Sequence, residues 1–92
     1  MNICAFRDFV ASDLELDAVM DAKRASALPQ CLAGMDRKHA AWETKRDKAC
    51  LEETEEDKGG SMYPMLLSSC KTEATRERIS FVKQSDSCSL GR

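Results

Sequence analysis

The chain has 92 residues, enough for one domain but short for burying a large core without further cross-links. One third of the residues are charged and the formal net charge is only −2, which argues against nucleic-acid binding because that needs a dense cationic surface. No apolar run approaches the ~18 residues of a membrane-spanning helix, so we expect no membrane span.

The spacing of apolar residues predicts an all-α protein with three helices and no sheet. The first helix spans residues 4–25, and its apolar side chains are Phe6, Phe9, Val10, Leu16, Val19 and Met20. Asp13 and Asp17 share that apolar side, where a buried carboxylate needs a partner. Pro29 then separates this helix from a second one over residues 32–58, which ends in the acidic run Glu52–Asp57. Acidic residues disfavour a helix C-terminus, so we expect its last turn to fray.

Gly59 and Gly60 form the next turn, and the third helix spans residues 62–84. Ser61 is a good N-cap residue, and Pro64 falls in the first turn, where a missing N–H is tolerated. Its inner face carries Leu66, Leu67, Cys70, Ala74, Arg78, Phe81 and Val82. Residues 1–84 therefore read as a single domain and residues 85–92 as a tail in coil conformation.

Five cysteines in so short a chain favour disulfides, which compensate for a thin core in small exported domains. The alternatives are reduced, buried cysteines in a cytosolic protein and a zinc site. Zinc is disfavoured because there is no C-x-x-C pair and His39 has no second nitrogen ligand nearby in the sequence. We expect a periplasmic or secreted protein whose leader peptide is absent from this sequence.

The positions of four cysteines predict how they pair. Two antiparallel helices place residues opposite each other when both are equally far from the connecting turn. Cys50 and Cys70 are equidistant from Gly60, and Cys31 and Cys88 are nearly symmetric about the same turn. We therefore predict an inner Cys50–Cys70 bridge and an outer Cys31–Cys88 bridge, which together cross-link an antiparallel helical hairpin.

Cys4 is left over by this pairing. An odd cysteine in an exported protein indicates a free thiol or an intermolecular bridge, so a dimer through Cys4 is one possible state. The inner bridge closes a loop of about 20 residues and is expected to stabilise the fold by roughly 3 kcal/mol.

Several short motifs together resemble the LprI-like lysozyme-inhibitor family over residues 1–84. They are W-x-x-x-R-D-x-x-C from Trp42 to Cys50, a G-G-S turn at Gly59, Cys70, and T-x-x-R from Thr75 to Arg78. The opening Met1-Asn2-Ile3-Cys4-Ala5, with Asp13 and Leu16, is similar to the first helix of that family. The resemblance implies an exported bacterial protein that binds another protein, in some members lysozyme.

The chain also departs from the family pattern. The Met-Asn-x-Cys motif normally follows an upstream cysteine, so the natural partner of Cys4 is missing from this sequence. Asp17 and Met20 stand where the family has Asn and Tyr. Cys31 and Cys88 are outside the pattern, so their pairing is predicted from geometry alone.

We interpret the motif side chains as structural, because residues on inward faces pack more often than they bind. The residues concerned are Asp13, Trp42, Arg46, Asp47, Thr75 and Arg78. Trp42 is a large anchor between helices. Arg46 and Arg78 are placed to pair with Asp13 or Asp17.

Catalysis is not expected. His39 is the only histidine and has no evident nucleophile beside it, and cysteines held in disulfides are not nucleophiles. No cofactor or metal is predicted.

The family resemblance favours inhibition of a lysozyme-type cell-wall hydrolase, by occlusion of its cleft with a rigid turn. The candidate binding residues are Lys58, Gly59, Gly60, Ser61 and Tyr63, although this turn is equally explained as a simple chain reversal. The acidic run Glu52–Asp57 can complement a basic enzyme surface. The alternatives are an immunity protein that neutralises a secreted bacterial toxin, and an envelope interaction module.

Overall fold

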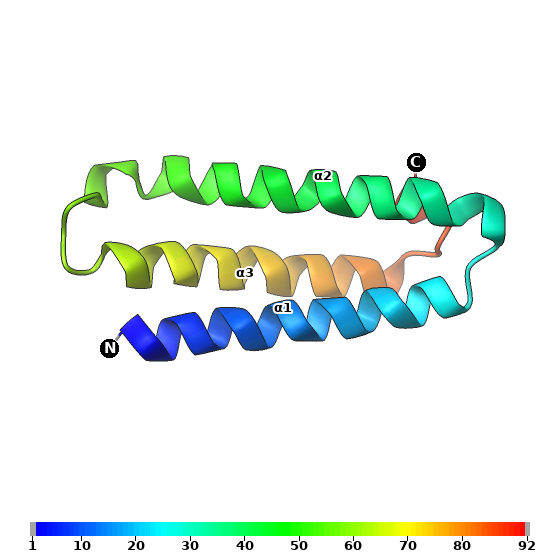
Figure 1. Ribbon diagram of the computed structural model, residues 1–92, viewed down its shortest axis with the longest axis horizontal. Helices are drawn as coiled ribbons and strands as arrows, with labels where there is room; N and C mark the ends of the chain where they lie inside the picture. The colour runs from blue at the N-terminus through cyan, green and yellow to red at the C-terminus, as the bar shows by residue number, and fades with distance from the viewer. Residues whose placement is uncertain (1, 92) are drawn as a thin grey trace.

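Three long helices make up most of the molecule (Figure 1). The computed structural model describes residues 2–91, with side chains described from Cys4 onward. The helices are α1 (Asn2–Ala25), α2 (Pro29–Glu53) and α3 (Tyr63–Gln84). The 3₁₀ turn η1 (Glu55–Asp57) lies between α2 and α3, and a second one, η2 (Ser89–Gly91), follows α3. Residues 2–91 contain no strand, so the all-α prediction is confirmed.

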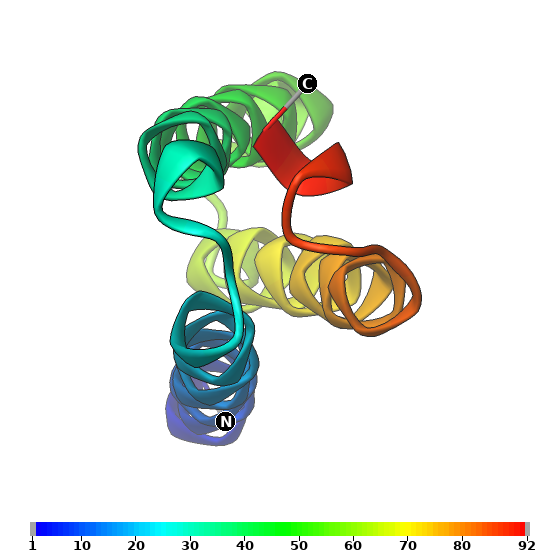
Figure 2. The ribbon, with the colours of Figure 1, turned by 90° about the vertical axis from the view of Figure 1, so that its right-hand side faces the viewer.

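The helices run up, down and up, in an elongated molecule of 47 × 22 × 17 Å. Helices α1 and α3 are parallel neighbours along their length, while α2 runs antiparallel and stands further from α1 (Figure 2). Within residues 2–91, no helix carries an apolar stretch long enough to cross a bilayer.

The core is small and lies toward the end of the molecule where the tail returns. Its buried side chains are Leu16, Met20, Met35, Ile79, Val82 and Leu90, with Val19, Leu32 and Trp42 packed against them. Two residues that the spacing placed on the apolar side of α1 lie outside this core, since Phe6 is 57% and Val10 38% exposed. That prediction is wrong because α1 has a close neighbour on one side only.

Helix α2 starts three residues earlier than predicted, with Pro29 in its first turn, where a missing N–H costs nothing. It ends at Glu53 rather than at residue 58. The hydroxyl of the buried Thr54 donates to the carbonyl of Cys50 at 2.7 Å, and the chain continues as η1. The acidic last turn was expected to fray, and in the structure the α-helix ends before it, at Glu53.

Helix α3 begins close to the predicted position, and Pro64 lies in its first turn as expected. Ser61 is not the N-cap. Met62 occupies that position, in a helical backbone conformation and with no side-chain capping bond. Ser61 therefore lies one residue before the cap position.

The last residues are not a coil throughout. They form η2 beside α2, where Leu90 is buried at 4% exposure. Gly34 and Gly91 permit this contact, because a Cβ on Gly34 would lie 3.0 Å from the Gly91 carbonyl oxygen. Gly34 weakens helix propensity, but it allows two backbones to approach.

Both predicted disulfides are present. Cys50 and Cys70 link α2 to α3 with a Cα–Cα distance of 5.7 Å, and Cys31 and Cys88 link α2 to the chain after α3 at 4.9 Å. Helix α2 is therefore held at both ends by covalent bonds, although its packing contact with α3 is sparse. Cys4 is free and exposed.

Candidate functional site

The turn between η1 and α3 lies at the end of the hairpin, beside the start of α1 (Figure 1). Lys58, Gly59, Gly60 and Ser61 are exposed, and Tyr63 is half-buried. Gly59 has a φ of +87°, a conformation that side chains strain to adopt. A glycine is thus required at this position for the reversal itself.

Acidic groups dominate this end of the molecule. Glu52 and Glu53 close α2, and η1 consists of Glu55, Glu56 and Asp57, all exposed. The ammonium of Lys58 lies 2.9 Å from the Glu55 carboxylate, and this hydrogen bond raises the pKa of Lys58. The turn therefore presents a negative surface with its one lysine already paired.

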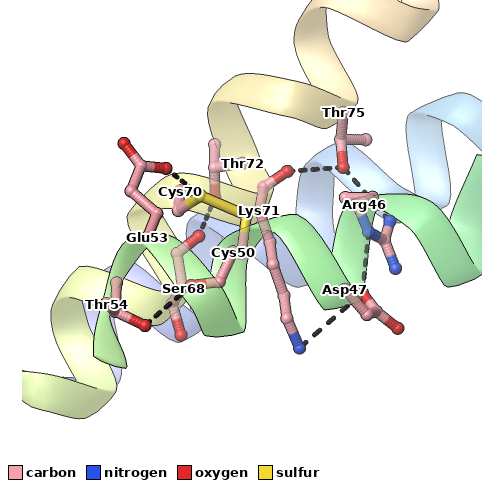
Figure 3. Close-up of a disulfide and its surroundings, with 10 residues drawn as sticks. All are labelled: Arg46, Asp47, Cys50, Glu53, Thr54, Ser68, Cys70, Lys71, Thr72 and Thr75. Carbon is pink, nitrogen blue, oxygen red and sulfur yellow. Dashed lines mark hydrogen bonds and ion pairs between the residues drawn. A yellow bond between two sulfur atoms is a disulfide. The ribbon is translucent and has the colours of Figure 1, made fainter. Parts of the chain in front are cut away.

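The inner disulfide lies one helical turn before this acidic end (Figure 3). A carboxylate oxygen of Glu53 is 2.9 Å from the sulfur of Cys70. Because that sulfur is in a disulfide, it has no proton to donate and no thiolate charge for a metal. The bridge itself therefore holds the end of α2 against the first turns of α3.

Arg46 connects all three helices. Its guanidinium donates to Asp13 of α1 at 3.2 Å, to Thr75 of α3 at 3.3 Å and to its neighbour Asp47 at 3.0 Å. The Arg46 side chain is only 5% exposed, and its carbon Cζ lies 5.0 Å from the ring centre of Trp42. Thr75 is fully buried, and its hydroxyl donates a hydrogen bond to the Lys71 carbonyl at 2.7 Å. The predicted pairing of Arg46 with Asp13 is confirmed.

Arg78 behaves differently from Arg46. Its guanidinium lies over the rings of Trp42 and Phe81, at 5.5 Å and 4.9 Å, and it makes no ion pair with any residue from 4 to 91. Its Nε is buried without a hydrogen-bond partner among the described residues, and burial lowers the pKa of Arg78. The predicted pairing of Arg78 with Asp13 or Asp17 is wrong, because Asp17 is exposed on α1 and Asp13 pairs with Arg46.

His39 is buried and stacks on Trp42 with ring centres 5.9 Å apart. Burial is the main cause that lowers its pKa, opposed by Glu43, whose carboxylate is 3.4 Å from Nε2. Its Nδ1 is buried and has no hydrogen-bond partner within the part of the chain that the structure describes. The ring is therefore a neutral packing element against Trp42 at pH 7.

The sequence reasoning missed one surface. Lys38, Trp42 and Lys45 lie along one side of α2 at four- and three-residue steps and border a groove with Arg78 and Phe81. That spacing was visible as a signal, but the opposite wall comes from α3 and η2, which only the fold brings there.

These contacts define a class: a small helical protein, cross-linked by two disulfides, whose motif residues tie the helices together. Comparison with known proteins identifies the family. The family model described as Lysozyme inhibitor LprI matches residues 1–81, and this chain belongs to that family.

A relative from Rhizobium meliloti (strain 1021), itself described as uncharacterized, supports the same placement. It is 35% identical over 97 aligned positions, covering 91% of this chain and 70% of the relative. No solved structure matches this chain.

Proposed function

We propose that this protein binds and inhibits a lysozyme-type cell-wall hydrolase, without chemistry of its own. The observation that carries the proposal is the match to the lysozyme-inhibitor family over most of the chain. Two disulfides support action outside the reducing cytosol, where such bonds persist.

The proposed mechanism is occlusion of the enzyme's cleft by the turn at residues 58–63. This turn projects at one end of a molecule 47 Å long, and the Cys50–Cys70 bridge lies close behind it. A turn that is already rigid loses little conformational entropy on binding, which favours affinity. Tyr63 adds a half-buried aromatic side chain at the base of the turn.

Charge complementarity supports the same end of the molecule. Its exposed carboxylates are Glu52, Glu53, Glu55, Glu56 and Asp57. A basic enzyme surface would be attracted to them, mainly through a faster association rate. Inhibition should therefore weaken as salt rises, because exposed charges are screened over about 8 Å at physiological ionic strength.

An inhibition assay against several lysozymes tests the proposal. We expect inhibition at micromolar protein, weakened at least about tenfold by Tyr63→Ala, in keeping with the loss of about 1.4 kcal/mol. Leu28→Ala is the matched control, because Leu28 is 56% exposed at the opposite end of the molecule. Absence of inhibition would contradict the proposed function. Equal inhibition by both variants would contradict the proposed role of the turn.

A disulfide-linked dimer through Cys4 is a further proposal about assembly. Cys4 is exposed in the first turn of α1 and has no partner cysteine among residues 2–91. The protein should then migrate as a dimer without reductant, and Cys4→Ser should migrate as a monomer. Monomeric migration of the unreduced wild type would refute this state.

A further inference from the structure

A groove of about 340 Å³ lies between α2, α3 and η2, away from the turn. Its main borders are Lys38, Trp42, Lys45, Arg78, Phe81 and Leu90. Three of these are cations, and no acidic residue in the described part of the chain borders the groove. Such a concentration of positive charge is notable in a chain with a net charge of −2.

None of the three cations has an ion-pair partner between residues 4 and 91. The groove therefore holds positive charge that no carboxylate among these residues neutralises. Arg78 is the clearest case, because it is only half-buried and, among the described residues, lacks the acid partner that an arginine in such a position normally has. By contrast, Arg46 uses its Nε and Nη1 donors within the protein, on Asp47, Asp13 and Thr75.

The guanidinium of Arg78 is also held in place before any ligand arrives. Trp42 and Phe81 both lie against it, so its planar fork of N–H donors is fixed. Such a fork matches the two oxygens of a carboxylate, and little side-chain entropy remains to be lost on pairing. Phe81, at 51% exposure, leaves apolar surface for the part of a ligand next to its carboxylate.

We propose that this groove binds an acidic side chain of the target protein, with Arg78 as the anchor and Lys38 and Lys45 as flanking charges. This rests on the proposed function, in which the target is a protein. A protein side chain is favoured over an acidic sugar because the Trp42 ring is already covered by Arg46, Arg78 and His39. Little flat aromatic surface therefore remains there for a sugar to stack on.

The position of the groove allows one target to contact both surfaces. Lys45 lies about 12 Å before the end of α2 at Glu53, at ~1.5 Å per helical residue, and the acidic η1 and the turn follow directly. A globular enzyme of about 100 residues, with a radius of gyration near 13 Å, spans that distance. The acidic turn and the cationic groove would then contact surfaces of opposite sign on the same enzyme, which fixes its orientation.

The groove can be tested without any hydrolase. The oxidised, ¹⁵N-labelled full chain is titrated at low ionic strength with acetyl-Gly-Glu-Gly-amide or its neutral counterpart acetyl-Gly-Gln-Gly-amide. The indole N–H of Trp42, the only tryptophan, and the Nε–H of Arg78 report binding. We expect saturable shifts with a Kd of about 1–10 mM for the Glu peptide alone.

Variants separate a specific site from general attraction. Arg78→Gln should weaken binding at least about tenfold, and Arg78→Lys should restore only part of it because the fork is lost. Lys45→Gln, at an exposed position, should weaken binding while leaving the fold intact. Arg76→Gln removes the same charge from a different side of α3 and should leave binding unchanged.

Equal shifts by the two peptides, or unchanged binding in both Arg78→Gln and Lys45→Gln, would overturn the proposal. N-acetylmuramic acid is the comparison ligand. If it binds at least about tenfold more tightly than the Glu peptide, the groove is a site for an acidic sugar and the protein side chain is the wrong ligand. Because no enzyme is present, failure here is distinct from failure of the inhibition assay.

Discussion

Replacing Arg46 with alanine is the sharpest test of what holds the three helices together. The substitution removes donors to Asp13, Thr75 and Asp47 at 3.0–3.3 Å. It also removes a guanidinium packed on two aromatic rings, at 5.1 Å and 5.0 Å from their centres. No other side chain described here joins α1, α2 and α3 in this way.

The size of the effect follows from the burial of each partner. Removing one member of a buried ion pair typically costs about 3–5 kcal/mol. The side chains of Asp13 and Asp47 are 36% and 46% exposed, so water partly replaces the lost bonds and lowers that figure. Thr75 keeps its bond to the Lys71 carbonyl. We therefore expect a loss of about 3 kcal/mol, or a Tm lower by roughly 12–24 °C.

Urea unfolding at pH 7 without reductant, followed by far-ultraviolet circular dichroism, measures this loss. Arg76→Ala, an exposed arginine on α3, is the matched control and should stay within about 0.5 kcal/mol of wild type. If Arg46→Ala is within about 1 kcal/mol of wild type and yet abolishes target binding, Arg46 is a binding residue and the structural reasoning is refuted.

Three further predictions concern the cross-links, the tail and pH. Changing Cys50 and Cys70 together to serine opens a loop with a sequence separation of 20 and should cost about 3 kcal/mol in urea unfolding; an unchanged midpoint would contradict it. Gly34→Ala should lower the Tm, because the new Cβ would lie 3.0 Å from the Gly91 carbonyl oxygen. At a helix position without such a neighbour, the same substitution would stabilise the helix by up to ~1 kcal/mol. A raised Tm would contradict this prediction and would show that η2 shifts away from Gly34 at little cost. Burial lowers the pKa of His39 below 6.5 in the folded protein. As the pH falls, the unfolded chain therefore binds this proton first. The contribution of the neutral ring to stability is fully present above about pH 6.5 and is lost as the pH drops toward the folded-state pKa. Urea midpoints at pH 7.5 and 5.5 should differ in wild type and less in His39→Asn, and an equal difference would refute this assignment.

Sequence periodicity was sufficient for the elements whose signals are local. The three helices and both disulfides were predicted because apolar spacing and distance from a turn are properties of the chain itself. The errors fall at helix ends, where competing local bonds decide. Thr54 ends α2 through its bond to the Cys50 carbonyl, and Met62 rather than Ser61 precedes α3.

The candidate sites divide in the same way. The turn at Gly59 was identified from its glycines alone, and the structure shows that its backbone requires one of them. The inward helical faces offered Arg46 two partners, Asp13 or Asp17, and the structure pairs it with Asp13. The environment of Arg78 did not, because helical faces give direction but not which neighbour is close enough to reach.

The sequence by itself determined that this chain is a helical hairpin cross-linked by cysteines, since these features depend on periodicity and symmetry about a turn. Only the tertiary structure decided which charges are satisfied. It brings Asp13 and Thr75 to Arg46, and it places Arg78 between two rings, with no acid from residues 4–91 paired to it. It also folds Leu90 back onto α2 through the contact of two glycines. These outcomes depend on distances between segments far apart in the chain, and no local pattern encodes them.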